Sequence, residues 1–458
     1  MYGWFFFVAA SEHAARVNTS KARADQSGYL WDAEQVYANW SGRTPPTLVG
    51  GRARMPLYAS YLALFYTPRQ TDPEFFHVAK AWNIRLALGL LLALFVIFAW
   101  HLPPLLATNL SLIVAFGYFV YKAGYAQPEL LFYFLFFVSF LSCWHLFREQ
   151  HAVNNVLWGA LAGSMAGLAY LTKALVPPFV VIFLIIYAIR AIVGLAAVRG
   201  LVPTQQSGGS IANDQTTRQK ALKRFWWRAA AAAVMGVSFL MVVYPYTSNS
   251  KRVLGGYFYN LNTTHYIWYD SGSIAMLATW DNTNQDGRIL LPPEQLPNFS
   301  TYWASHTVGQ IIERLSEGLT DMVVRSYTAY GYLKYLVLYV GFALVLVAAN
   351  PGAAGTLARQ QWALLLFLLA YAAVYLAGTA FFVPISGTGS MRFLLAHAAP
   401  LFFVLSCFFA RAPFCATVWS VGRVRLTATH FHVFVLAIIG LELTFTLWRR
   451  LMTTYGGF

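Results

Sequence analysis

Apolar runs of about 20 residues recur along this chain, separated by short polar connections. A helix of this length crosses the hydrocarbon core of a bilayer, and its backbone hydrogen bonds are all satisfied within the helix. A membrane barrel would instead have short segments of alternating polarity. We therefore predict transmembrane helices near Ala81–Trp100, Leu105–Tyr121, Leu130–Phe147, Val156–Leu171, Val176–Val198, Ala229–Tyr246, Tyr335–Ala349, Trp362–Val383, Phe393–Ala410 and His432–Trp448.

The N-terminal run Met1–Ala10 is apolar but too short to cross a bilayer alone, and it lacks the basic start of a signal peptide. We expect it to be the outer end of a first helix whose beginning this sequence lacks, giving roughly 11 spans in one membrane domain, 1–458. A polar first loop, 11–71, follows. Within this loop we predict two interfacial helices, near Tyr29–Trp40 and Pro56–Tyr66, because their Trp and Tyr residues suit the headgroup level.

The orientation follows from the segment 199–228, a hydrophilic loop rich in Lys and Arg with one acid, Asp214. Lys and Arg accumulate in cytoplasmic loops, so this loop is assigned to the cytoplasm. Threading outward from it places the first loop, the 122–129 turn and a large polar segment, 247–333, on the outer side. The net charge of +15 is explained by this topology, and no nucleic-acid partner is expected.

Composition agrees with the membrane assignment. The chain is 58% hydrophobic and only 11% charged, whereas a soluble domain has about a quarter charged residues. The few ionisable groups beside apolar spans are therefore candidates for function, because such groups are costly near lipid. Glu442 is one of them. It lies well inside the last span, and its sequence context identifies no partner for it.

Two acids on the outer side are candidate catalytic residues, Asp25 and Glu129. Asp25 precedes an expected helix, so it is either an N-cap or a catalytic carboxylate. Glu129 follows Pro128 at a helix start, where a carboxylate complements the helix dipole. Its alternative role is a carboxylate that faces the same outer surface as Asp25.

The outer side also has several cations at span ends. Each has two interpretations: its long stem extends to the interface, or its charge binds a phosphate group. The candidate phosphate-binding residues are Arg54, Lys173, Arg52 and Arg392.

In their order along the chain, these motifs resemble those of the GT-C membrane glycosyltransferases. The likeness is strongest to the family-39-like enzymes, which include protein O-mannosyltransferases and bacterial aminoarabinose transferases, and it covers nearly the whole chain. The matching segments are Asp25–Tyr29, Arg54–Tyr58, Gln127–Glu129, Leu171–Ala174, Arg392–Ala396 and Tyr257–Asp270. The chain departs from the family pattern at Gln26, Glu129, Ala174 and Ala396.

This resemblance implies a polyprenyl-phosphate-linked sugar donor and a lipid, glycan or protein acceptor, brought together at the outer face of the plasma membrane. Asp25 would be the general base on the acceptor hydroxyl, and Glu129 would orient the acceptor or hold the basic residues. The cations would stabilise charge on the leaving phosphate. The expected substrate-binding residues are Tyr29, Tyr58, Tyr269 and Asp270. No cofactor is certain, and a divalent metal is left open.

Two other functions remain as alternatives. A lipid-linked sugar transporter or flippase would have functional charges deep within its spans and broken helices. A non-catalytic assembly subunit could retain the same fold without chemistry. The gathering of charges at one face favours the enzyme.

Overall fold

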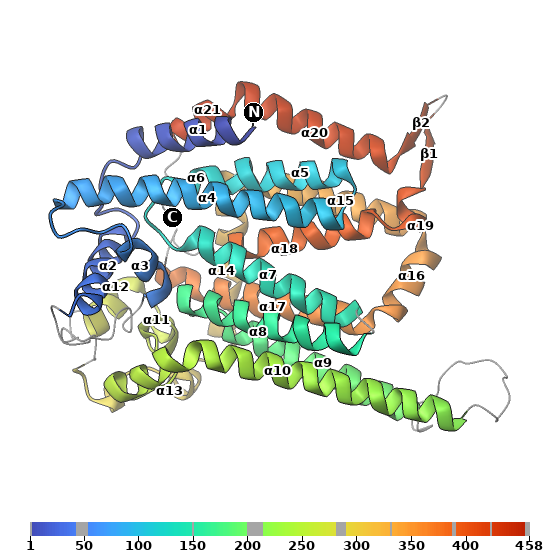
Figure 1. The fold of residues 1–458 in the computed structure, drawn as a ribbon, viewed down its shortest axis with the longest axis horizontal. Helices are drawn as coiled ribbons and strands as arrows, with labels where there is room; N and C mark the ends of the chain where they lie inside the picture. The colour runs from blue at the N-terminus through green and yellow to red at the C-terminus, as the bar shows by residue number, and fades with distance from the viewer. Residues whose placement is uncertain are drawn as a thin grey trace.

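The computed structural model describes residues 2–42, 54–148, 151–198, 214–280, 290–329, 332–386, 391–421 and 424–453. Long helices run side by side and form the body of the molecule (Figure 1). Eight of the described helices are long and apolar enough to cross a membrane, or up to nine if one bent pair is a single span. The chain is therefore an all-α polytopic membrane protein, as the apolar runs predict.

The first part of the chain consists of two short helices that follow α1 and a pair of spans. A Thr71–Glu74 capping box begins the first of these spans, and a π-helical turn interrupts the second. The elements are α1 (Tyr2–Arg16), α2 (Gln26–Trp40), α3 (Pro56–Ala63), α4 (Asp72–His101), α5 (Pro104–Val114), the π turn η1 (Ala115–Phe119) and α6 (Val120–Ala123). Helices α2 and α3 confirm the two short helices expected in the first loop.

The central part contains α7 (Glu129–Arg148), α8 (Ala152–Thr172), α9 (Pro177–Val198) and α10 (Asp214–Leu254). Helix α7 is the most enclosed candidate span, with 78% of its most apolar stretch buried. Helices α8 and α10 pack closely because small residues line α8. A Cβ atom at Gly159 would lie 2.5 Å from the Ala231 carbonyl oxygen on α10, and such small-residue contacts are common between membrane helices.

The large polar segment, 247–333, is substantially helical. Helix α10 extends into it, and α14 (Val308–Ala329) supplies a long amphipathic helix. The shorter elements are α11 (Leu261–Thr264), η3 (Tyr266–Trp268), α12 (Gly272–Ala275), η4 (Met276–Trp280), η5 (Pro293–Gln295) and α13 (Phe299–Ser305).

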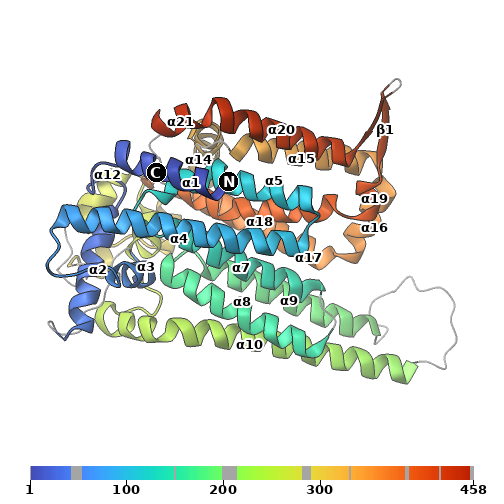
Figure 2. The same cartoon turned by 45° about the horizontal axis from the view of Figure 1, so that its top comes forward.

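The C-terminal part contains the remaining spans, with a bend of 105° between α15 and α16. Its elements are α15 (Tyr332–Ala349), α16 (Pro351–Gln360), α17 (Trp362–Ser386), α18 (Met391–Phe409), α19 (Ala412–Cys415), β1 (Val418–Val421), β2 (Val424–Thr427), α20 (Ala428–Phe445) and α21 (Leu447–Thr453). The hairpin of β1 and β2 is antiparallel, and the sequence patterns do not predict it. Helices α15 and α20 lie side by side (Figure 2). Between them the Phe342 and Phe431 rings stack with their centroids 3.8 Å apart.

The short helices gather at one end of the bundle. Figure 1 shows α2, α3, α11 and α13 together at this end, which we call the α2 end, while α16 and the β hairpin lie at the opposite end. The sequence threading places the first loop and segment 247–333 on one side, and their helices do lie at one end. Residues 199–213, half of the basic segment 199–228, lie outside the described residues. The other half, 214–228, forms the first part of helix α10, so the prediction of a loop is wrong for it.

Candidate active site

A left-handed turn precedes α2 and directs Asp25 away from the helix. Ala24 and Asp25 have φ angles of 59° and 62°, a conformation that costs about 1–3 kcal/mol for a residue other than glycine. Asp25 occupies the N-cap position, but its side chain makes no capping hydrogen bond. The N-cap interpretation is therefore wrong for this side chain.

Buried amides hold this turn in place. Gln26 and Asn18 exchange two side-chain hydrogen bonds of 2.8 Å, and the Ala126 backbone N–H donates to Gln26 Oε1 at 3.0 Å. Asn18 Nδ2 also donates to the Gly124 carbonyl, and Gln127 Nε2 donates to the Ala24 carbonyl. These bonds attach the turn before α2 to the turn before α7, so the two candidate acids have a common support.

Asp25 and Glu129 are joined by a chain of ion pairs. Arg392 Nη2 lies 2.9 Å from Asp25 Oδ2, and Arg392 Nη1 lies 3.6 Å from Glu129 Oε1. Lys173 Nζ lies 2.8 Å from the same Glu129 oxygen. We call these four residues the acid–base cluster. They come from the α2 turn, α7, the α8–α9 turn and the start of α18, so four distant segments of the chain meet at one site.

The acid–base cluster is open at one side and closed at the other. The Asp25 side chain is 53% exposed, whereas that of Glu129 is 1% exposed. Lys122 is also buried, and it lies close enough to Glu129, Arg392 and Lys173 to interact with their charges. An ionised carboxylate is buried only at high cost unless cations surround it. The accessible carboxylate of Asp25 therefore lies next to a buried group of side chains, most of which are cations.

The surrounding charges change the acidity of the groups outside the spans. Partial burial raises the pKa of Asp25, but the charge and hydrogen bond of Arg392, together with the charge of Lys173, outweigh it. The pKa of Asp25 is thereby held below its ordinary 3.8, so this carboxylate is ionised at neutral pH. Burial lowers the pKa of Lys173 although Glu129 opposes that shift.

Two buried polar atoms of the acid–base cluster have no hydrogen-bond partner within the described residues. They are the Nε atom of Arg392 and the Oε2 atom of Glu129. Buried polar atoms are nearly always hydrogen-bonded, and exceptions need an explanation, such as a bound group or a water. The backbone at Arg392 is nevertheless fixed, since Tyr133 Oη donates to its carbonyl at 2.6 Å.

Arg54 is next to the acid–base cluster but pairs with another acid. Its Nε and Nη2 atoms donate to the two oxygens of Asp32, at 2.6 and 3.4 Å. The guanidinium crosses the first turn of α2, where a Cβ atom at Gly28 would lie 2.5 Å from its Cζ. It also faces the Tyr29 ring at 5.9 Å. Arg52 lies outside the described residues.

The expected substrate-binding tyrosines fall in different positions. Tyr29 is buried, and it interacts electrostatically with Glu129 and Asp25. Tyr58 is fully buried beside it, with ring centroids 5.6 Å apart, and its hydroxyl donates to Asn83 Oδ1. Tyr29 therefore lies beside the acid–base cluster, whereas Tyr58 packs against the Tyr29 ring.

Asp270 belongs to a second cluster, and Tyr269 precedes it in the chain. Asp270 pairs with Arg314 of α14 at 3.4 Å and with His306 at 3.2 Å. Arg314 also donates to the Tyr302 hydroxyl and the Phe381 carbonyl. Asp270 is thus held by His306 and by Arg314 of α14, and Arg314 also contacts α17. None of these contacts joins the acid–base cluster.

Sequence reasoning missed three participants: Lys122, Asp32 and Gln26. Lys122 and Glu129 lie at the two ends of the same short turn. This closeness in sequence is a signal that could have identified Lys122. Asp32 lies on the expected interfacial helix near Tyr29–Trp40, and it forms the ion pair with Arg54, which we expected to bind phosphate. Gln26 was noted only as a departure from a family pattern, although its buried amide uses both its donor and its acceptor.

Within the described residues, no group of three or more His, Cys, Asp or Glu side chains is placed to hold a metal ion. Comparison of the chain with protein-family models, with curated proteins and with solved structures finds no match.

Proposed function

We propose that the protein is a membrane glycosyltransferase of the GT-C type. It transfers a sugar from a polyprenyl-phosphate donor to an acceptor hydroxyl at the outer face of the plasma membrane. The observation that supports this most directly is the acid–base cluster, in which an accessible ionised carboxylate pairs with Arg392, and Arg392 is linked to Lys173 through the buried Glu129. We also propose that the GT-C fold of this protein has roughly 11 transmembrane helices.

In the proposed reaction, Asp25 accepts the proton of the acceptor hydroxyl through Oδ1, because Oδ2 faces Arg392. The acceptor oxygen forms a bond to the anomeric carbon while the bond between that carbon and the phosphate oxygen breaks. Attack opposite the leaving group inverts the anomeric configuration. Polyprenyl phosphate leaves with one additional negative charge, and no strong general acid is needed.

Arg392 and Lys173 are the cations suited to the leaving phosphate. The unpartnered Nε of Arg392 is a donor that a phosphate oxygen could use, and a charge-assisted bond of this kind is stronger than a neutral one. Electrostatic stabilisation of developing charge is usually the largest contribution to such catalysis. Glu129 positions both cations, so we propose it as a positioning residue.

The test uses purified protein in vesicles that contain a defined polyprenyl-phosphate sugar and an acceptor. Asp25→Asn should lower kcat by at least about a hundredfold, since general bases contribute 10²–10⁴-fold, without a change in thermal stability. Asp72→Asn is the matched control, because Asp72 lies on the same end and pairs with Lys21. An Asp25→Asn rate equal to that of the control would refute the assignment.

The alternative of a lipid-linked sugar transporter or flippase gives a different result in the same vesicles. It predicts movement of the labelled donor lipid between leaflets without a glycosylated product. Lys122, which is buried within a span beside Glu129, is the observation that keeps this alternative in the experiment.

A further inference from the structure

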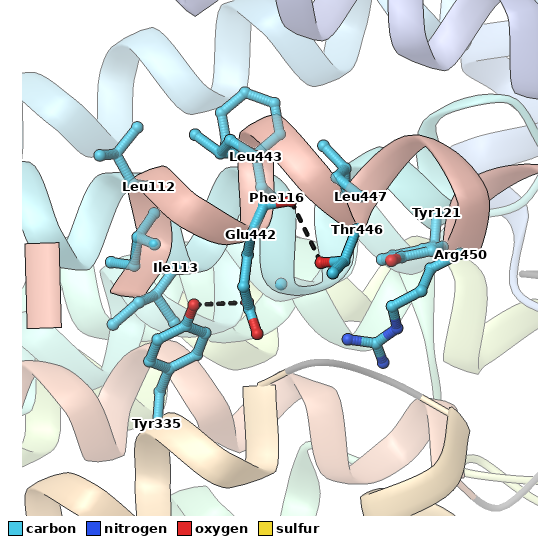
Figure 3. Close-up of a pocket in the computed structure, with 12 residues that line it drawn as sticks. Leu112, Ile113, Phe116, Tyr121, Tyr335, Glu442, Leu443, Thr446, Leu447 and Arg450 are labelled. Carbon is cyan, nitrogen blue, oxygen red and sulfur yellow. Dashed lines mark hydrogen bonds between the residues drawn. The ribbon is translucent and has the colours of Figure 1, made fainter. Parts of the chain in front are cut away.

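A second candidate site, with two charged side chains in its wall, lies between membrane helices and apart from the acid–base cluster. It is a partly open pocket: its empty space counted together with the solvent at its mouth is about 350 Å³, and only a small part of that space is enclosed. Figure 3 shows it between α5–η1, the start of α15 and the junction of α20 with α21. Apolar side chains form most of its wall, and its polar members are Tyr121, Tyr335, Glu442, Thr446 and Arg450.

The π-helical turn η1 helps to shape the pocket. Phe116 and Gly117 of this turn line the wall, and the whole turn is buried. A single π turn inside an α-helix strains the backbone ladder and occurs frequently at functional sites. Its coincidence with a charged pocket is an independent reason to consider that the pocket binds a ligand.

Glu442 is neutralised inside the protein. Tyr335 Oη donates to Glu442 Oε2 at 2.6 Å, and Lys334 forms an ion pair with Oε1. The carboxylate that looked isolated in the sequence therefore has two partners on α15. Lys334 is the cation that forms an ion pair with its carboxylate, and it balances that charge.

Arg450 is the remaining charge at this pocket. Its side chain extends from α21 toward the interior of the pocket (Figure 3), and within the described part of the chain it forms no ion pair. With Lys334 and Glu442 balanced, the formal charge at the pocket is +1. A cation beside the low-dielectric interior of a membrane protein is stabilised by an anion. Arg449, the neighbouring residue, is exposed and does not line the pocket.

We propose that this pocket binds the phosphate group of a membrane phospholipid. Arg450 would bind the phosphodiester with the paired donors of its guanidinium. The apolar wall and the outward face of α20 would contact the acyl chains, since Leu441 and Phe445 on that face are 59% and 74% exposed. The occupant comes from the bilayer because the pocket lies between membrane helices. This site is independent of the proposed transferase chemistry.

The test measures phospholipid retained by the purified protein, by native mass spectrometry after exchange into detergent containing phosphatidylglycerol. Arg450→Gln should retain at least about tenfold less lipid than the wild type, because a charge-assisted phosphate contact is lost. Arg449→Gln should retain as much as the wild type. Equal retention by all three proteins, or equal losses in both variants, would overturn the proposal.

Three further probes identify the ligand. Diacylglycerol, which has the chains without the phosphate, should bind weakly, and its retention at the level of phosphatidylglycerol would overturn the role of Arg450. Displacement of the phospholipid by inorganic phosphate or by a polyprenyl phosphate at equal concentration would also overturn it. If Arg450→Gln does not fold, the wild-type melting temperature decides: phosphatidylglycerol should raise it and diacylglycerol should not.

Discussion

At the scale of single residues, the candidate site depends on how Asp25 is held. Its carboxylate is available because the turn before α2 is left-handed at two successive residues, and the buried amides of Gln26 and Asn18 stabilise that turn. Conformational strain of this kind persists where neighbouring contacts determine it, and such places are commonly functional sites. The identity of Gln26 is as informative here as that of Asp25, because a carboxylate at position 26 could not donate hydrogen bonds.

Replacing Gln26 with leucine should weaken both folding and catalysis. The buried Ala126 N–H would lose its acceptor, at a cost of about 1–3 kcal/mol. The Asp25 turn would be attached more weakly, since the bonds between Gln26 and Asn18 would be lost and the bond from Gln127 to the Ala24 carbonyl would remain. We expect a lower melting temperature together with a lower kcat and a nearly unchanged donor KM. Gln70→Leu is the control, since Gln70 accepts from the exposed Thr67 N–H at the same end. A variant with normal kcat would show that Gln26 does not position Asp25.

The acid limb of the pH–activity profile tests the electrostatic role of Lys173. In the folded protein Arg392 and Lys173 hold the pKa of Asp25 below its ordinary value, so the base stays ionised as the pH falls. Lys173→Gln removes one cation and also leaves Arg392 as the main partner of Glu129. Both changes raise the pKa of Asp25, so the acid limb of kcat/KM should move to higher pH.

Lys21→Gln provides the comparison for that profile, because Lys21 pairs with Asp72 and not with the acid–base cluster. Its acid limb should coincide with that of the wild type. If Lys173→Gln leaves the limb in place or moves it to lower pH, Lys173 does not act on Asp25.

At the scale of elements, helix starts supply most of the site. Glu129 begins α7, Lys173 directly follows α8 and Arg392 lies at the start of α18. Apolar runs predict these boundaries well, since a charge at the edge of a run marks the end of a span. They do not predict partners. Arg54 and Asp32 pair because α2 and α3 pack together, and no pattern in either segment specifies that packing.

Gly28 tests the contact between α2 and Arg54. A methyl group at this position would collide with the Arg54 guanidinium, whereas a methyl group at Gly89 on α4 would meet nothing within 4 Å. Gly28→Ala should displace Arg54 and weaken its bond to Asp32. If Arg54 also binds donor phosphate, donor KM should rise by about tenfold, measured by steady-state kinetics.

Gly89→Ala should leave KM unchanged and stabilise the protein slightly, because alanine has the higher helix propensity, by about 1 kcal/mol. A normal KM for Gly28→Ala would mean that Arg54 serves only the packing of α2 against α3.

At the scale of the whole molecule, the site exists because spans return the chain repeatedly to one end. Counting spans from the sequence predicts that Asp25, Glu129, Lys173 and Arg392 share a side, and the structure brings all four together. The same counting places Tyr269 and Asp270 on that side, yet Asp270 pairs with Arg314 in a separate cluster. Span parity fixes a side of the membrane, whereas contacts within that side depend on tertiary packing that hydropathy does not encode.

The assignment of the α2 end to the outer side can be tested by cysteine labelling in intact cells. In a variant without Cys143, Cys407 and Cys415, single cysteines would replace Thr67 near α3 and Thr356 on α16, both of which are exposed. Because the basic 199–228 segment should be cytoplasmic, a membrane-impermeant maleimide should label position 67 in intact cells and position 356 only after permeabilisation. The opposite pattern would put the acid–base cluster on the cytoplasmic side, where nucleotide-activated sugars are present and a lipid-linked donor is not required.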